Sequence, residues 1–252
     1  MHNKLLELSM NNLADEDGDI LHIPHGDMPG DKINIEKSHI EKAKVIFPEL
    51  IKKVKECATT NSKVVITVCG GSGVGKSEIA SLLAHYFENM GVGCYTLSGD
   101  NYPYRIPVYN DAERLRIFRE SAIRGMITDG EYSFERFNII HQYQLENKDS
   151  EPKNIVKYPW YESYIRNGAM GLQGYLGTEK EINFFEIQNI VKEFKSGAEK
   201  IWLKRMGRED TELWYEEVDF SEKDILIIEW THGNSKNYTG VDIPVLLNST
   251  PK

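Results

Sequence analysis

The sequence predicts an α/β fold in which a parallel sheet is flanked by helices and interrupted by a long helical and irregular insertion. Three observations carry this prediction. A glycine-rich turn at residues 70–77 lies between a β-branched apolar run and a run with helical spacing. Short apolar runs alternate with helical stretches further along the chain. Residues 105–182 are too long for a simple connection in a compact domain, so we expect an insertion at about these positions.

The first 35 residues are polar and acidic, with several turn-forming residues. We expect an N-terminal extension over residues 1–35 that either docks on the domain or stays mobile, followed by a domain over residues 36–252. His22, His25 and Asp27 lie close together in the sequence. Because they have no cysteine nearby and no further converging ligand, we do not expect a metal site there.

The elements around the glycine turn follow from local pattern. Residues 38–57 have apolar side chains at helical spacing, and Pro48 either kinks this helix or divides it in two. Residues 64–69 are predicted as a buried parallel strand and residues 78–87 as the helix after the turn. A second strand is predicted at residues 94–98.

Inside the insertion, helices are predicted at residues 111–124 and 134–145. Residues 158–177 are rich in glycine and aromatic residues, which is typical either of a mobile loop that offers ring faces to a ligand or of plain packing. The remaining predicted core strands are a weak one at residues 200–203 and two stronger ones at residues 225–228 and 243–247.

The glycine turn matches the phosphate-loop pattern G-x-x-x-x-G-K-[ST] in full. Glycines let backbone N–H groups approach phosphate oxygens, and the helix that follows directs its positive end at the same anion. The lysine of this pattern reaches the β- and γ-phosphates, and the hydroxyl ligates Mg²⁺. We therefore expect ATP and Mg²⁺ as cofactors. The predicted nucleotide-binding residues are Gly70, Gly71, Ser72, Gly73, Val74, Gly75, Lys76 and Ser77.

Two carboxylates follow predicted strands. Asp100 lies just beyond the strand at residues 94–98, where it can accept a proton from an acceptor hydroxyl, or merely cap a turn. Glu229 closes an apolar run, which is typical of a second Mg²⁺ partner, the alternative being a strand end that faces solvent. His232, in the loop that follows, is a weaker candidate for a phosphate or substrate contact.

Residues 105–124 contain five arginines and no lysine. Guanidinium groups suit a phosphorylated or otherwise anionic substrate, but the spacing of Glu113 with Arg116 also fits ordinary ion pairs on a helix surface. Arg105 is set apart as a substrate-binding candidate, because it lies close in sequence to Asp100.

With these motifs the chain resembles the uridine kinase and phosphoribulokinase family of P-loop small-molecule kinases, over residues 62–104 and 183–250. The resemblance rests on the phosphate loop, on Ser98-Gly99-Asp100-Asn101-Tyr102 and on the apolar strand that ends at Glu229. It implies a nucleoside-kinase-like fold, Asp100 as the catalytic base, and substrate contacts from Tyr102 and from Arg205 or Arg208.

Three features depart from that family. Trp230 stands where the family has glycine, and the insertion has no counterpart there. The family also continues beyond the position of Lys252 into a helix and an arginine-bearing lid. We therefore expect either a shortened chain or an insertion that supplies the lid.

These observations predict an ATP-dependent, Mg²⁺-requiring kinase that phosphorylates a hydroxyl of a small metabolite such as a nucleoside, sugar or sugar phosphate. Lys76 and Asp100 would be the catalytic residues, and Ser77 and Glu229 would hold the metal ion. The alternative is a nucleotide-dependent switch or scaffold ATPase that acts through a protein partner.

Composition limits the partners. The net charge of −9 argues against nucleic acid, and no apolar run approaches the ~20 residues needed to span a membrane. The three cysteines lack a C-x-x-C spacing, which is typical of reduced thiols in a cytoplasmic protein. The oligomeric state stays open, a homodimer included.

Overall fold

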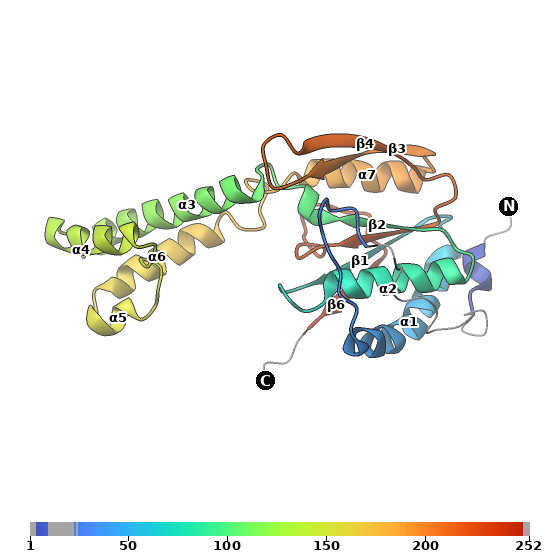
Figure 1. Cartoon of the computed structure of the whole chain (residues 1–252), viewed down its shortest axis with the longest axis horizontal. Coiled ribbons are helices and arrows are strands. Elements are labelled where there is room, and N and C mark those ends of the chain that lie inside the picture. The colour runs from blue at the N-terminus through green and yellow to red at the C-terminus, as the bar shows by residue number, and fades with distance from the viewer. Residues whose placement is uncertain (1–3, 10–22, 24, 249–252) are drawn as a thin grey trace. The chain divides into compact units, whose positions relative to one another are not determined.

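The computed structural model describes residues 4–9, 23 and 25–248, and the chain divides into two compact units. The core unit comprises Met1–Pro103 and Asn183–Lys252, and the inserted unit comprises Tyr104–Ile182. The core unit is an α/β structure with a parallel sheet flanked by helices (Figure 1), so the predicted fold class is confirmed.

Among the described residues, the main sheet has four strands in the order β2-β5-β1-β6, all parallel. Strand β1, one of the two inner strands, is rich in β-branched residues and almost completely buried, as a parallel strand covered on both faces should be. All four strands were predicted from their apolar runs. Their bounds are β1 Val64–Gly70, β2 Cys94–Ser98, β5 Ile225–Glu229 and β6 Ile243–Leu247.

Two helices of the core unit pack together beside β1. Helix α1 (Lys37–Ala58) contacts α2 (Lys76–Asn89), where Phe47 meets the rings of Tyr86 and Phe87 edge-on. Pro48 lies inside α1 and does not divide it. Because its neighbours along the helix are buried against the sheet and α2, packing offsets the loss of one helical hydrogen bond.

The described part of the N-terminal segment lies on the core unit. A 3₁₀ helix, η1 (Lys4–Glu7), buries Leu5, and Leu8 and Ile23 join the same hydrophobic core as α1 and α2. Docking, the first of the two predicted alternatives, therefore holds for these residues. His22, one of the paired histidines, lies outside the described residues.

The weak strand predicted at residues 200–203 does not belong to the main sheet. It forms β3 (Lys200–Met206), which pairs antiparallel with β4 (Leu213–Asp219) as a separate ribbon. Helix α7 (Phe184–Ser196) precedes this ribbon. Sequence analysis missed β4 because its largely exposed side chains include three acidic residues and lack a core strand's apolar run.

The inserted unit is helical. Tyr161 and Tyr164 lie in its core beside Phe118, so the aromatic stretch at residues 158–177 packs an interior and is not a free loop. Gly168 lies against the Phe118 ring and Gly171 against Ser121, which lets two helices approach closely. The helices are α3 (Pro107–Thr128), α4 (Phe134–Leu145), α5 (Asn154–Lys157) and α6 (Tyr161–Gln173).

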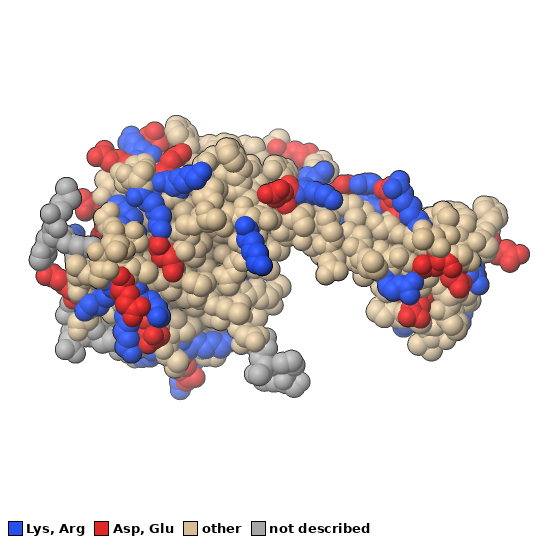
Figure 2. All heavy atoms as spheres, turned by 180° about the vertical axis from the view of Figure 1, so that it is seen from behind, with Lys and Arg blue, Asp and Glu red and all other residues tan. Residues whose placement is uncertain are grey.

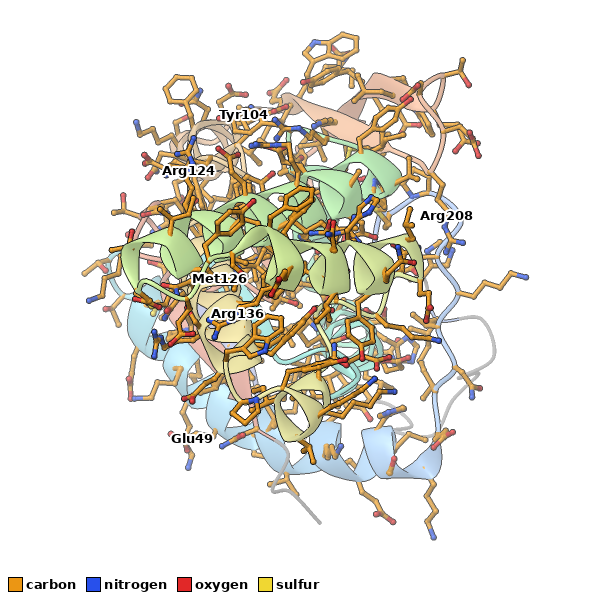
Figure 3. All side chains as sticks on the ribbon, turned by 90° about the vertical axis from the view of Figure 1, so that its left-hand side faces the viewer. Glu49, Tyr104, Arg124, Met126, Arg136 and Arg208 are labelled. Atoms are coloured by element: carbon orange, nitrogen blue, oxygen red, sulfur yellow. The ribbon has the colours of Figure 1, made fainter. Side chains whose placement is uncertain are left out.

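The arginines of α3 are paired within the inserted unit. Arg119 donates to Asp149 at 2.7 Å, and this buried carboxylate also accepts a hydrogen bond from the Tyr164 hydroxyl. Figure 3 labels two residues that mark the faces of α3, since Met126 is buried and Arg124 is exposed. Ordinary ion pairs therefore explain these arginines better than an anionic substrate. The other pairs join Arg114 to Glu181, Arg116 to Glu113 and Arg124 to Glu120.

The surface mixes charges of both signs. In the view of Figure 2, Lys and Arg side chains are interspersed with Asp and Glu side chains on the described part of the chain. Within that part, each helix is too short or too polar to cross a membrane.

The glycine contact between α3 and α6 gives a stability prediction. A Cβ at Gly168 would lie 2.6 Å from the Phe118 ring, so Gly168→Ala should lower the free energy of unfolding by about 1–3 kcal/mol. The better helix propensity of alanine offsets roughly 1 kcal/mol of this cost, so the net loss falls in the lower part of that range. Urea-induced unfolding followed by circular dichroism measures the effect.

Gly174→Ala is the matched control at the end of the same helix. A Cβ there would lie 3.4 Å from the Gly171 carbonyl oxygen, and the backbone φ of −74° suits alanine. We expect a change within about 0.5 kcal/mol. Equal losses in both variants would contradict the close contact between the helices.

Candidate active site

The phosphate loop connects the end of β1 to the start of α2. Gly73 and Gly75 have φ angles of 73° and 88°, which favour glycine. Gly70 must lack a side chain for a steric reason, because a Cβ there would collide with the carbonyl oxygen of Leu247. The loop thus lies directly against the end of β6.

Two side chains at the start of α2 carry the loop's chemistry. The Lys76 ammonium donates to the carbonyl oxygen of Gly71 at 3.1 Å and so lies back over the loop. The Ser77 side chain lies close enough to the Glu229 carboxylate on β5 to lower the pKa of that group. The structure therefore brings the predicted loop residues next to the predicted acidic residue.

Glu229 ends β5 between two neighbouring strands. Its Cα pairs with that of Val68 on β1 and that of Ser98 on β2. Only 6% of the residue is exposed. Burial raises the pKa of its carboxyl group to about 7, and the negative charge of Asp100 acts in the same direction. The Lys76 charge opposes this rise, so Glu229 lies within electrostatic reach of both predicted catalytic residues.

Asp100 lies in a 3₁₀ turn, η4 (Gly99–Asn101), that follows β2 directly. The turn packs on the indole of Trp230, against which a Cβ at Gly99 would collide. Trp230 is 1% exposed and fills the space beneath the turn. The uridine kinase and phosphoribulokinase family has glycine at the position of Trp230. In this chain the large Trp230 packs against the small Gly99, and this contact positions Asp100.

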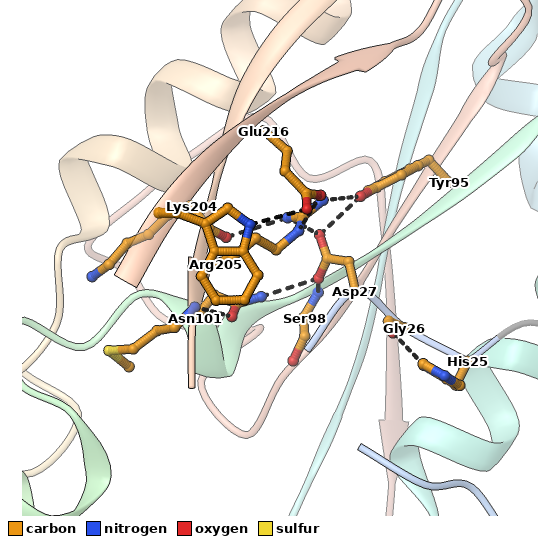
Figure 4. Close-up of polar contacts among 11 residues, drawn as sticks. His25, Gly26, Asp27, Tyr95, Ser98, Asn101, Lys204, Arg205 and Glu216 are labelled. Carbon is orange, nitrogen blue, oxygen red and sulfur yellow. Dashed lines mark hydrogen bonds and ion pairs between the residues drawn. The ribbon is translucent and has the colours of Figure 1, made fainter. Parts of the chain in front are cut away.

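A buried polar cluster holds the other side of that turn (Figure 4). The Asp27 carboxylate accepts hydrogen bonds from the backbone N–H of Ser98 at 2.7 Å and from the Asn101 side chain at 3.2 Å. Asn101 in turn accepts from the backbone N–H of Met206 at 3.0 Å. Burial raises the pKa of Asp27 to about 6, although the Arg205 charge opposes this rise. The cluster therefore joins the N-terminal segment, η4 and β3.

Arg205 has a different role from the substrate contact that the resemblance implies. Its guanidinium donates to Asp27 at 2.8 Å, to the Tyr95 hydroxyl at 2.9 Å and to Glu216 at 3.0 Å (Figure 4). Its side chain is only 6% exposed. Because its donors are directed at protein groups, Arg205 organises the cluster and does not present a binding surface.

Tyr102 also departs from its expected role. The residue is completely buried, and its hydroxyl group has no hydrogen-bond partner within the described residues. Burial raises the pKa of this hydroxyl far above its ordinary value. Tyr102 is therefore a core residue beneath the turn, out of reach of a soluble substrate.

The remaining substrate candidates lie in three places. Arg208 follows β3 and is exposed on the core unit (Figure 3). His232 follows β5 and sets its ring edge-on against Trp230, with ring centroids 5.3 Å apart. Arg105 belongs to the inserted unit, where it donates to the Tyr175 hydroxyl at 3.1 Å.

The charge of Asp31, a residue that sequence analysis did not single out, also acts on Glu229. Like the charge of Asp100, it raises the pKa of that carboxyl group. Asp31 precedes β1 by more than thirty residues, and only a short turn around Pro29 and Gly30 marks it in the sequence. No local pattern could connect it to β5.

The donors present fit Mg²⁺. Within the described ranges no group of three or more His, Cys, Asp or Glu side chains forms a metal cluster. A hydroxyl and a carboxylate, as supplied by Ser77 and Glu229, are the hard oxygen ligands with which Mg²⁺ is held beside phosphate groups. A Mg²⁺ site completed by a nucleotide therefore suits these residues better than a site made by protein alone.

The fold and the loop together define a P-loop nucleotide-binding protein. Residues 48–124 match the model of a family described as Zeta toxin. The chain is also 39% identical over 204 residues to the bifunctional alpha-galactosidase/sucrose kinase AgaSK of Mediterraneibacter gnavus. That similarity covers 80% of this chain and 17% of the relative, so the chain spans a small part of the relative's length. Both similarities support a P-loop kinase-like protein.

The raised pKa of Glu229 predicts a pH dependence of stability. The ordinary pKa of this carboxyl group is 4.5. At pH values between 4.5 and about 7, Glu229 therefore holds a proton in the folded protein that it has released in the unfolded chain. The resulting stabilisation is fully present below pH 4.5 and is lost as pH rises through about 7. Relative to Glu229→Gln, wild type should lose up to about 3 kcal/mol across this window. Urea-induced unfolding at several pH values tests this, and parallel pH curves for the two proteins would contradict it.

Proposed function

We propose that the chain is an ATP-dependent kinase that transfers the γ-phosphoryl group to a hydroxyl of a small sugar. The observation that carries this proposal is the meeting of Lys76, Ser77, Glu229 and Asp100 at one edge of the sheet. The printed activity of the relative, a sucrose kinase, supports a sugar as the acceptor. We infer sucrose as the first candidate.

In this proposal the loop and the first turn of α2 bind the triphosphate. Backbone N–H groups of residues 70–77 and the Lys76 ammonium contact the phosphate oxygens. Ser77 and Glu229 would hold Mg²⁺, which neutralises charge on the phosphates when bound. The Glu229 carboxyl must be ionised for this, and the nearby Lys76 charge favours the ionised form.

Asp100 would accept the proton of the acceptor hydroxyl. As the hydroxyl oxygen forms its bond to the γ-phosphorus, the bond between this phosphorus and the oxygen of the departing ADP breaks, and the hydroxyl proton passes to the Asp100 carboxylate. The position of Asp100 supports this role, because its turn is held by Trp230 on one side and through Asn101 by Asp27 on the other.

The contacts of the arginines bear on the acceptor. Those of α3 are engaged with acidic side chains, which weakens the argument for a sugar phosphate and favours a neutral sugar. Arg208 and His232 are the core-unit candidates that we retain for acceptor contacts. We also propose that the chain shares with uridine kinase and phosphoribulokinase one arrangement of the site, in which a phosphate loop, a catalytic base and a carboxylate at the end of a strand lie together.

We further propose that residues 36–252 act as one kinase domain that carries the insertion at about 105–182, with residues 1–35 as its extension. The burial of Leu5 and Leu8 supports a structural role for that extension. The three cysteines are free thiols, and Cys69 and Cys94 are buried, which supports a reducing compartment such as the cytoplasm.

ADP release in the presence of Mg·ATP tests the proposed activity across sucrose, monosaccharides, nucleosides and sugar phosphates. We expect a neutral sugar to stimulate ADP release, and Lys76→Ala to abolish the stimulation because the phosphates lose their cation. Stimulation by none of these acceptors, with ATP still bound, would favour the nucleotide-dependent switch instead.

Substitution of the proposed base gives a second test. Asp100→Asn keeps the size of the side chain but cannot accept the proton, so kcat should fall by about 10²–10⁴-fold while the affinity for ATP changes little. Asp219→Asn, an exposed position at the end of β4, is the matched loss of charge and should leave kcat unchanged. Unchanged turnover in Asp100→Asn would remove this residue from the mechanism.

A further inference from the structure

A hollow of about 510 Å³ lies beside the phosphate loop on the core unit. Helix α1 forms one wall, the end of β6 forms another, and the loop itself contributes Val74. The residues that matter here are Glu41, Lys42, Val45, Val74, Leu246 and Asn248. No role described so far uses this space.

The hollow is continuous with the phosphate loop. A Cβ at Gly75 would lie 3.0 Å from the imidazole of His39, so the start of α1 packs directly on the loop. The backbone N–H of Glu36 donates to Nδ1 of His39 at 3.1 Å, which leaves the proton of the neutral ring on Nε2, the nitrogen that faces the loop. On the opposite side, Gly70 lies against the carbonyl oxygen of Leu247.

The order of the strands gives a bound triphosphate its direction. Glu229 ends β5 and Asp100 follows β2. These two strands lie on one side of β1, whereas β6 lies on the other. In a kinase the γ-phosphate must face the acceptor and its base. The nucleoside therefore leaves the loop away from β5 and β2, toward β6 and the hollow.

The lining suits a flat heterocycle. Val45, Val74 and Leu246 line the hollow with apolar side chains against which a ring can pack. Glu41, Lys42 and Asn248 supply both donors and acceptors for ring nitrogens and exocyclic groups. An apolar cavity of several hundred Å³ with a few polar groups is the common form of a small-molecule site.

We propose that this hollow binds the base of the nucleoside triphosphate, which makes α1 part of the nucleotide site. The inference rests on the proposed function, because it takes the direction of the triphosphate from the phosphoryl-transfer groups. It adds residues 38–46 of α1 and the end of β6 to the determinants of nucleotide affinity. The stretch of α1 concerned precedes residues 48–124, which match the family model.

Filling the hollow from either wall tests the inference. Val45 is 79% exposed and Leu246 is 65% exposed, so Val45→Trp and Leu246→Trp add bulk without opening the core. Lys52→Trp places the same side chain at an exposed position of α1 that does not line the hollow. Isothermal titration measures the binding of ATP and of inorganic tripolyphosphate, each with Mg²⁺, to all four proteins.

Wild type and Lys52→Trp should bind ATP at least about tenfold more tightly than tripolyphosphate. At least one of the two filled variants should lose most of this preference while binding tripolyphosphate like wild type. Full retention of the ATP preference in both filled variants, or its absence in wild type, would overturn the inference.

The two proposals fail in different ways. Binding data as expected, combined with no ADP release for any acceptor, would remove the kinase activity and leave the base site standing. Acceptor-dependent ADP release combined with an undiminished ATP preference in both filled variants would support the kinase activity and remove the base site. Binding of neither ligand by wild type would refute both.

Discussion

The parallel pairing of β2, β5 and β1 is the constraint on which the candidate site depends. Parallel neighbours end at the same edge of a sheet, and here Ser98 pairs with Glu229, which in turn pairs with Val68. The turn that carries Asp100, the carboxylate of Glu229 and the phosphate loop are thereby brought to one edge. A slip of one residue in either pairing would turn Glu229 to the other face of the sheet and separate these groups.

Burial makes this arrangement costly as well as functional. Glu229 is buried, and the negative charge of Asp100 acts on it, so the pKa of its carboxyl group is raised and its ionised form is disfavoured. Asp27 is in a similar position, but hydrogen bonds and the Arg205 guanidinium surround it. Removing one partner of such a buried pair leaves an uncompensated charge, which is far more damaging than losing a surface pair. The cluster around Asp27 thus fixes the turn of Asp100 firmly.

The inserted unit uses its distinctive residues for its own packing. Its arginines pair with acidic side chains, its tyrosines surround Asp149, and its glycines let α3 and α6 approach closely. Features that resemble a ligand site in the sequence are therefore explained by the interior of a small helical unit. On the core unit, in contrast, the hollow beside Val74 adjoins the phosphate loop on the side of β6, which is why we propose it for the base of the nucleotide.

The sequence by itself determined the phosphate loop, the four main strands and the helix at residues 134–145, because each depends on residues that are contiguous or regularly spaced. It also pointed to Glu229 and Asp100, since both follow recognisable strands. Only the tertiary structure decided that the charge of Asp31 acts on Glu229 and that β3 leaves the main sheet to pair with β4. Arg205 and Asp27 show the reason, because they are 178 positions apart in the chain and no local pattern encodes a contact over that separation.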